Sequence, residues 1–278
     1  IGMWPGQEEA LRYSRGQYIL ALSVDVMLTP SFIRNAVQVA EQNLTIGAVQ
    51  AKVYQYDHSE LETYGHHLKG IVLDTCGFKI FRSRRVANTG HGQSDRGQYD
   101  VQREVFSVEG AVPFFRRTAL EALKLSGSIA DRDYFWYGDD LDLGWRMHLF
   151  GFMQVYAPRV IAYHDRSTTK GSATDWRDAL RRIHERRRIP LFKRRLDWAN
   201  VRFTIIKNDY IINILKDLPW IITREFATLL YIVLFEPSVL TAVVRFLRLL
   251  PRMLAKRRRI LARATATASE IHRWFRDE

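Results

Sequence analysis

Three carboxylates stand close together in the middle of the chain, directly after an aromatic run and a glycine. Asp139, Asp140 and Asp142 follow the stretch Tyr134 to Gly138, and apolar residues recur at helical spacing from Leu141 onward. The first two acids therefore stand where a helix begins, so that unpaired backbone N–H groups and the helix dipole stabilise their charge. A general base on a rigid helix start is one interpretation of this stretch. An ordinary acidic helix cap is the other.

Another acid, Asp25, follows an apolar run that has the composition of a buried strand. The run is Tyr18 to Leu22; a helix is expected from Ser31 to Gln42 and another strand from Ile46 to Val53. This strand–helix–strand rhythm predicts a doubly wound α/β domain. An acid at the carboxyl end of such a strand is well placed to bind a ligand. A turn or helix cap explains Asp25 equally well.

Two further segments offer residues to such a site. A strand that begins at Val160 ends in His164, which is either a metal ligand or a polar plug. A strand pair is predicted from Val105 to Phe115 with its hinge at Gly110. The small residues Gly110 and Ala111 would allow a substrate to approach the backbone closely.

Composition limits the classes of function. The chain has 278 residues, enough for one large domain or one domain with an appendage, and its 42 Lys and Arg exceed its 30 Asp and Glu to give a formal charge of +12. This excess indicates an anionic partner: nucleic acid, nucleotide phosphates or a membrane surface. The single cysteine, Cys76, excludes an internal disulfide and fits a reducing compartment.

His66, His67 and His91 are interpreted as surface or hydrogen-bonding residues, because no second ligand has usable spacing.

The composition changes at residue 176, which divides the chain into regions 1–175 and 176–278. Nine Lys or Arg residues stand between positions 177 and 195, and a strongly apolar region follows. Its longest uncharged run, Phe226 to Phe235, has ten residues, too few to span a bilayer. Proline interrupts helix interiors, so Pro219, Pro237 and Pro251 should divide the region into helices of roughly 12–16 residues. Helices lying in a membrane interface beside anionic lipid are favoured over a helical subdomain packed on the α/β core.

These motifs, in this order, resemble bacterial family 2 glycosyltransferases of GT-A fold, in a rhamnosyltransferase-like branch. The resemblance implies that Asp25 is a metal ligand of the family's DxD-type motif, although Ser23 departs from that motif. It implies that Asp140 is the catalytic base of the ED-type motif, with Asp139 in place of Glu, and that His164 contacts metal or diphosphate. Gly110 and Ala111 would line the donor and acceptor cleft.

The resemblance also implies the reaction and its setting. The expected reaction is inverting transfer of a sugar, rhamnose being the first guess, from a nucleotide donor with Mg²⁺ or Mn²⁺. The expected acceptor is lipid-linked or polysaccharide, at the cytoplasmic face of the bacterial inner membrane. Trp136 and Tyr137 form either an apolar wall against the acceptor or packing beneath the acidic turn. Residues 1–7 resemble a later loop of the family, so we expect a truncated GT-A domain without its first strands and its contacts to the nucleotide base.

Two other functions compete with this one. The charge of +12 would suit a nucleic-acid-binding protein, but the basic residues cluster beside apolar helices instead of alternating with aromatic residues on an open face. Nucleic acid is therefore not expected as a partner. A catalytically inactive, membrane-bound assembly subunit is the other alternative, which the departure at Ser23 supports.

Overall fold

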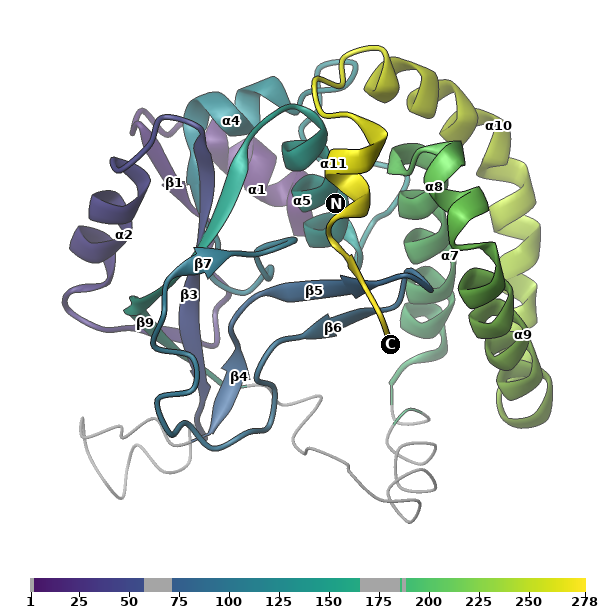
Figure 1. The fold of residues 1–278 in the computed structure, drawn as a ribbon, viewed down its shortest axis with the longest axis horizontal. Coiled ribbons are helices and arrows are strands. Elements are labelled where there is room, and N and C mark those ends of the chain that lie inside the picture. Colours follow the sequence, from purple (N-terminus) through teal and green to yellow (C-terminus); the bar gives the residue numbers. More distant parts are fainter. Residues whose placement is uncertain (1–2, 58–71, 166–185, 187–188) are drawn as a thin grey trace.

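The computed structural model describes residues 3–57, 72–165, 186 and 189–278 (Figure 1). The strands are β1 (Tyr18–Leu20), β2 (Val26–Leu28), β3 (Ile46–Gln55), β4 (Leu73–Thr75), β5 (Phe78–Phe81), β6 (Val86–Asn88), β7 (Arg103–Glu104), β8 (Phe114–Arg116), β9 (Met153–His164) and β10 (Phe275–Arg276). The helices are α1 (Met3–Leu11), α2 (Phe32–Ala40), α4 (Arg117–Ala122), α5 (Asp139–Leu149), α7 (Leu191–Asn208), α8 (Ile211–Lys216), α9 (Leu218–Phe235), the 3₁₀ helix η1 (Pro237–Thr241), α10 (Ala242–Leu261) and α11 (Ala268–His272).

The main sheet is mixed and has β3 and β9 at its centre. Its strand order is β1-β8-β3-β9-β2, with β4 also paired to β3 and β7 paired to β9. The two central strands are parallel, and the other described pairs of this sheet are antiparallel. The α/β class is confirmed, but the doubly wound parallel arrangement is wrong. Short strands that reverse direction beside β3 and β9, such as β8 and β2, account for the difference.

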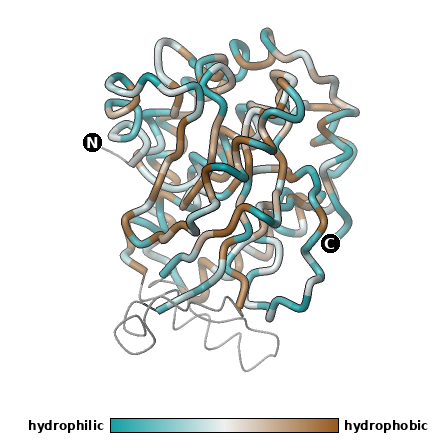
Figure 2. The backbone as a smooth tube through the Cα atoms, turned by 90° about the vertical axis from the view of Figure 1, so that its left-hand side faces the viewer, coloured by the Kyte–Doolittle hydropathy of each residue, from teal (hydrophilic) through white to brown (hydrophobic). Residues whose placement is uncertain are grey.

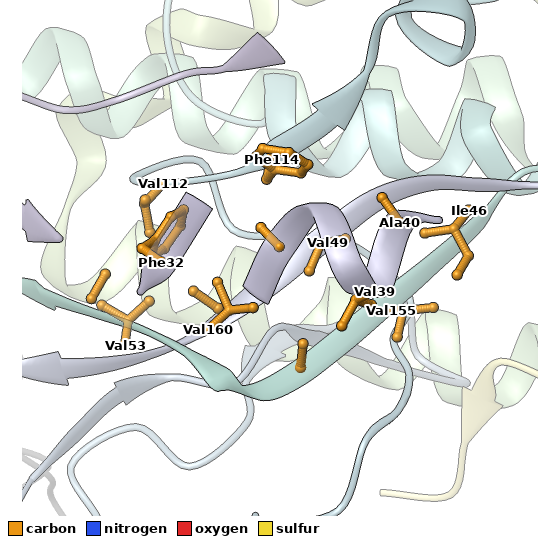
Figure 3. Packing of buried hydrophobic residues seen from close by; sticks show 14 residues of the cluster. Phe32, Val39, Ala40, Ile46, Val49, Val53, Val112, Phe114, Val155 and Val160 are labelled. Carbon is orange, nitrogen blue, oxygen red and sulfur yellow. The ribbon is translucent and has the colours of Figure 1, made fainter. Parts of the chain in front are cut away.

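Both faces of the central strands are covered. Helix α2 places Phe32, Ala36 and Val39 about one turn apart, and these side chains pack on β3 and β9 around Val49 and Val155 (Figure 3). The opposite face is packed by α1, α4 and α5. Because both faces are buried, β3 has an almost uninterrupted buried pattern instead of alternation. In Figure 2 the hydrophobic segments correspondingly run through the middle of the molecule.

A second, three-stranded sheet joins the C-terminal end of the chain to residues 78–88. Its order is β10-β5-β6, and β10 from the C-terminal end pairs in parallel with β5. Phe275 of β10 packs edge-on against Trp145 of α5, and Ile271 joins the same core cluster. Thr267 and Glu270 form a reciprocal capping box at the start of α11. The sheet thereby ties the last residues to the helix that begins with the acidic pair.

The C-terminal helices gather at one side of the molecule, to the right in Figure 1, and α7 packs against both α5 and α10. Two of the predicted proline breaks coincide with helix ends, because Pro219 lies in the first turn of α9 and Pro237 begins η1. The break predicted at Pro251 is wrong. Helix α10 continues through it, held on either side by Phe246, stacked on Phe203 at 5.1 Å, and by the buried Met253.

Helix α9 is longer than its uncharged run suggested. It spans 18 residues, because the helix continues through Arg224 and Glu225 instead of beginning after them. By length and composition it could cross a membrane, with a mean hydropathy of 1.5, and 6% of it is buried. Among the described residues it is the one helix that meets this condition.

Candidate active site

The turn before α5 has an unusual backbone that another helix holds in place. Phe135 and Tyr137 have φ values of 67°, and Gly138 follows at 79°. Non-glycine residues in this left-handed region are strained and persist where the surroundings hold them. Here Asn200 of α7 shares its side-chain N–H groups among the carbonyl oxygens of Tyr134, Trp136 and Tyr137, at 3.1, 2.8 and 2.9 Å. Helix α7 therefore sets the shape of the turn that presents Asp139 and Asp140.

Asp140 lies against the glycine that the sequence singled out. A Cβ added to Gly110 would stand 3.2 Å from Asp140 Oδ2, so any other residue would crowd the carboxylate. The backbone N–H groups of Leu141 and Gly110 donate to this carboxylate, the first at 2.9 Å. Ser107 Oγ donates to the Asp140 backbone carbonyl at 2.8 Å. The expected strand pair hinged on Gly110 is wrong: residues 110–111 form a turn, Val112 is in a bend, and β8 begins at Phe114.

The acidic pair is hard to ionise. Desolvation by the surrounding protein, with the nearby charge of Glu109, raises the pKa of Asp140 to about 6. Burial, with the charges of Asp140 and Asp142, raises the pKa of Asp139 to about 8. Asp139 is 4% exposed, and its Oδ2 has no hydrogen-bond partner within the described part of the chain. At neutral pH Asp140 is therefore an ionised base near its pKa, whereas Asp139 stays protonated.

Asp142 has a different role from its two neighbours. Although burial opposes ionisation, Arg146 and Lys207 hold the pKa of Asp142 below its ordinary value. Arg146 Nη2 lies 2.8 Å from Asp142 Oδ2, and Lys207 Nζ lies 2.9 Å from Oδ1. Lys207 also pairs with Asp131 at 2.6 Å, which joins α7 to the loop before the acidic turn. Asp142 is thus a structural anion, and Glu109 supplies the like charge that acts on Asp140.

Asp25 and His164 come together where β2 begins and β9 ends. Val26 of β2 pairs with His164 of β9 in an antiparallel register, so the preceding Asp25 lies beside the histidine. His164 Nε2 is 3.4 Å from Asp25 Oδ2, and the Asp25 side chain is 36% exposed. His164 Nδ1 lies 2.8 Å from Oδ2 of the fully buried Asp74 on β4. The structure therefore brings the two expected metal ligands into one place.

The backbone connects this pair with the acidic turn. Ser23 N–H donates to the Ala111 carbonyl at 2.9 Å, and Ala111 directly follows the glycine that touches Asp140. Glu109 accepts a hydrogen bond from Ala111 N–H at 2.9 Å, so its carboxylate belongs to the same turn. A set of contacts thus runs from Ser23, two residues before Asp25, through residues 109–111 to Asp140.

The donor set at Asp25 and His164 fits a divalent cation that also binds phosphate. Within the described residues, no three His, Cys, Asp or Glu side chains form a metal-binding group. Octahedral Mg²⁺ with ligands at about 2.1 Å places neighbouring ligands about 3 Å apart, close to the observed 3.4 Å. Such ions are commonly held by one or two protein ligands, with water and substrate phosphates in the other positions. Two protein donors are therefore enough for this kind of site.

An aromatic pair lies on the strained turn. The rings of Trp136 and Tyr137 are stacked with centroids 5.4 Å apart and planes at 17°, and Lys193 Nζ lies 4.0 Å from the Trp136 centroid. Both aromatic residues are partly exposed. Partly exposed aromatic rings on this turn would suit contact with the apolar face of a sugar ring.

Several contributors have no strong signal in the sequence. Glu109 could have been noticed, because it directly precedes the Gly-Ala pair. Asn200 and Asp74 could not, since each acts on a segment far away along the chain. His91 is partly exposed and hydrogen-bonded to the backbone of Asp74 at 2.8 Å, as expected for a hydrogen-bonding histidine. His66, His67 and most of the basic cluster lie outside the described residues, as does the boundary at 175–176.

Comparisons with known proteins agree with an α/β domain of GT-A-like architecture followed by helices. A family model described as glycosyltransferase like family 2 matches residues 6–186, more than half of the chain. The chain belongs to this family. No curated protein matches it.

Two solved structures are similar to the chain at low identity. One, GalNAc-T7 with UDP, GalNAc and Mn²⁺, has a TM-score of 0.42 and 12% identity, covering 66% of this chain and 34% of that one. The other, the mannosyltransferase PcManGT from Pyrobaculum calidifontis with GDP-Man and Mn²⁺, has a TM-score of 0.38 and 14% identity, covering 96% and 65%. The chain thus spans less than two thirds of either structure's length.

Proposed function

We propose that this protein transfers a sugar from a nucleotide-diphosphate donor to a hydroxyl group of a glycan or lipid-linked acceptor, with inversion at the anomeric carbon. The observation that carries the proposal is the position of Asp140. This carboxylate has a raised pKa, lies against Gly110, and is connected through residues 109–111 to Asp25 and His164. A base and an anion-compensating pair on either side of a small-residue turn are what such a transfer requires.

Each part of the proposed reaction has its own residue. The acceptor oxygen attacks the anomeric carbon as its proton passes to the Asp140 carboxylate, and the bond from that carbon to the diphosphate oxygen breaks. The bonding electrons leave with the nucleoside diphosphate. The stacked rings of Trp136 and Tyr137 hold the acceptor sugar beside the base. Asp25 and His164 would hold Mg²⁺ or Mn²⁺, which when bound supplies positive charge against the departing diphosphate.

The proposal includes an anionic membrane surface as the place where the acceptor is met. Large apolar side chains of α8, α9, η1 and α10 are exposed: Ile211, Ile212, Leu215, Leu218, Trp220, Ile222, Phe226, Leu229, Leu230, Val233, Leu234, Phe235, Leu240, Val244, Leu247 and Leu254. We call this set the apolar surface. So many exposed large apolar side chains on neighbouring helices are uncommon in monomeric soluble proteins and suggest an interaction site.

The charges around the apolar surface favour lipid headgroups of negative charge. Its acidic residues are withdrawn: Asp217 and Glu236 are buried, and Glu225 pairs with Arg202 of α7 at 2.5 Å. The exposed charged side chains of α8 to α10 are therefore basic: Lys216, Arg248, Arg252, Arg258 and Arg259. Since Glu225 ties α9 to α7 near its middle, we propose that α9 lies in the interface instead of crossing the bilayer. The cytoplasmic face of a bacterial inner membrane would supply such a surface.

Liposome flotation tests the membrane part. Vesicles with phosphatidylglycerol should carry the protein to the top of the gradient, and neutral phosphatidylcholine vesicles should carry less. Replacing Leu229 and Leu234 together by Glu should weaken vesicle binding on the order of 100-fold, because two apolar side chains would no longer be buried in the lipid. Leu44→Glu, at a residue 74% exposed outside the apolar surface, is the matched control. Equal flotation of the double variant, or resistance to alkaline carbonate, would contradict an interfacial α9.

Turnover of sugar nucleotides tests the transfer itself. The protein is incubated with Mn²⁺, a lipid-linked acceptor and a panel of donors that begins with deoxythymidine-diphosphate rhamnose. Release of nucleoside diphosphate should depend on the donor and should be lost in Asp140→Asn. A folded protein that turns over none of the donors would contradict the proposal and favour an inactive assembly subunit.

A further inference from the structure

A buried carboxylate on β4 takes no part in the proposed transfer, yet it touches a residue that does. Asp74 is 0% exposed, and its Oδ2 lies 2.8 Å from His164 Nδ1. His91 holds the same residue from another side, with Nδ1 2.8 Å from the Asp74 carbonyl oxygen and 3.2 Å from Oδ1. Burying a carboxylate costs free energy unless it is hydrogen-bonded, so its place at this histidine calls for a role.

The geometry orients the two nitrogens of His164 in opposite directions. Nδ1 faces Asp74, and Nε2 faces Asp25 at 3.4 Å. Both facing groups are carboxylates, which only accept hydrogen bonds, and Asp74 is the closer one, at 2.8 Å against 3.4 Å for Asp25, so the single proton of the neutral ring is assigned to Nδ1. The neutral ring then presents the Nε2 lone pair at the Asp25 side. A ring with the opposite tautomer would present an N–H group there, which binds an anion but not a metal ion.

We propose that Asp74 is a positioning residue that selects the Nδ1–H tautomer of His164 and so makes Nε2 a ligand for the divalent cation held with Asp25. This inference rests on the proposed function. It decides between the two contacts expected of His164, assigning it to the metal ion and not to the diphosphate. Carboxylate–histidine–metal arrangements orient the ring and raise its basicity in the same way. His91 supports the backbone of Asp74 through the hydrogen bond to its carbonyl oxygen.

Substitution of Asp74 by Asn tests the assignment while keeping the side chain's shape. In Asp74→Asn the new side-chain amide would donate an N–H to Nδ1, moving the ring proton to Nε2 and blocking the lone pair. Mn²⁺ affinity, measured from the EPR signal of the free ion, should fall by about 10–100-fold, the usual effect of losing such a partner. Asp95→Asn is the matched control. It removes another carboxylate of the same sheet region, bonded to Lys52 and Tyr54, and should leave Mn²⁺ affinity unchanged.

A second measurement reads the tautomer without any metal. ¹⁵N NMR of the histidine rings should place the His164 proton on Nδ1 in the wild type and on Nε2 in Asp74→Asn, with His164→Gln identifying the signals. A wild-type proton on Nε2 would overturn the inference even if the variant did not fold. Wild-type Mn²⁺ affinity in Asp74→Asn, or Mn²⁺ bound without coupling to a histidine nitrogen, would also overturn it. Neither result would depend on sugar turnover, so failure of the proposed function remains distinguishable.

Discussion

The site contains two pairs of titratable side chains, Asp25 with His164 and Asp139 with Asp140, and they are built in opposite ways. Asp25 and His164 lie at strand ends, with the Asp25 side chain 36% exposed and its partner set by the register of β2 against β9. Asp139 and Asp140 lie at a helix start, where Asp139 is 4% exposed and both pKa values are raised. An open carboxylate beside an imidazole suits a cation, whereas a desolvated carboxylate near its pKa suits proton transfer.

The pairs also differ in what holds them. Sheet hydrogen bonds place Asp25 and His164, so their geometry comes from the same interactions that form the α/β core. The acidic turn is held from outside the core by α7, through Asn200 on the turn's carbonyls and Lys207 on Asp131 and Asp142. Helix α10 adds contacts from Arg252 and Lys256 to the loop before the turn. The acidic turn therefore depends on the C-terminal helices, whereas the described pairing of Asp25 with His164 follows from the sheet.

The largest effect is expected from substitutions that disable one pair at a time. Asp140→Asn should lower the transfer rate by about 10²–10⁴-fold, the usual contribution of a general base, with Mn²⁺ affinity unchanged. Asp25→Asn should instead weaken Mn²⁺ binding, so that more Mn²⁺ is needed for the same rate. Rates measured over a series of Mn²⁺ concentrations distinguish the two results. If both variants shift the Mn²⁺ dependence alike, the division of roles is wrong.

A smaller effect on turnover is expected from replacing Asn200, which holds the backbone of the acidic turn. Asn200→Ala leaves three carbonyl oxygens without their donor and releases a strained backbone, which should cost about 1–3 kcal/mol of unfolding free energy and lower turnover. Mn²⁺ affinity should stay at the wild-type value. Asn35→Ala, which removes one similar bond to the Arg159 carbonyl on the far side of the sheet, is the control and should retain turnover. Loss of Mn²⁺ binding in Asn200→Ala would show that the pairs are not independently held.

A further effect is a pH dependence of stability. The pKa of Asp139 is about 8 in the folded chain, above that of an unfolded Asp. Between these values the unfolded state is ionised while the folded state keeps its proton, so stability falls as the pH rises through this window. Asp139→Asn removes the titration, and its melting temperature relative to wild type should increase from pH 4 to pH 8 and then level off. Asp277→Asn, at an 87% exposed side chain, should show no such trend. A constant difference would contradict the raised pKa.

The sequence predicted the parts of the candidate site that depend on local periodicity alone. Helical periodicity after Asp140 follows from neighbouring residues, and α2 and β3 were predicted with similar bounds. Asp25 was expected at the end of the strand that starts at Tyr18, but β1 ends at Leu20 and Asp25 directly precedes β2. The mixed direction of the sheet was not predictable, since strands as short as β2 and β8 carry little periodicity. The roles of Asn200 and Asp74 depend on contacts between distant segments, which no local pattern encodes. The continuous helix through Pro251 depends in the same way on tertiary packing.

The pH dependence of transfer is the most direct test of Asp140 as the base. With donor and Mn²⁺ held constant, kcat/KM should rise about tenfold per pH unit below pH 6 and level off above it, following the pKa of about 6 in the free protein. The rise should be absent from the residual activity of Asp140→Asn and unchanged in Asp277→Asn. A wild-type profile that is flat from pH 4 to pH 8, or the same rise in Asp140→Asn, would contradict the account.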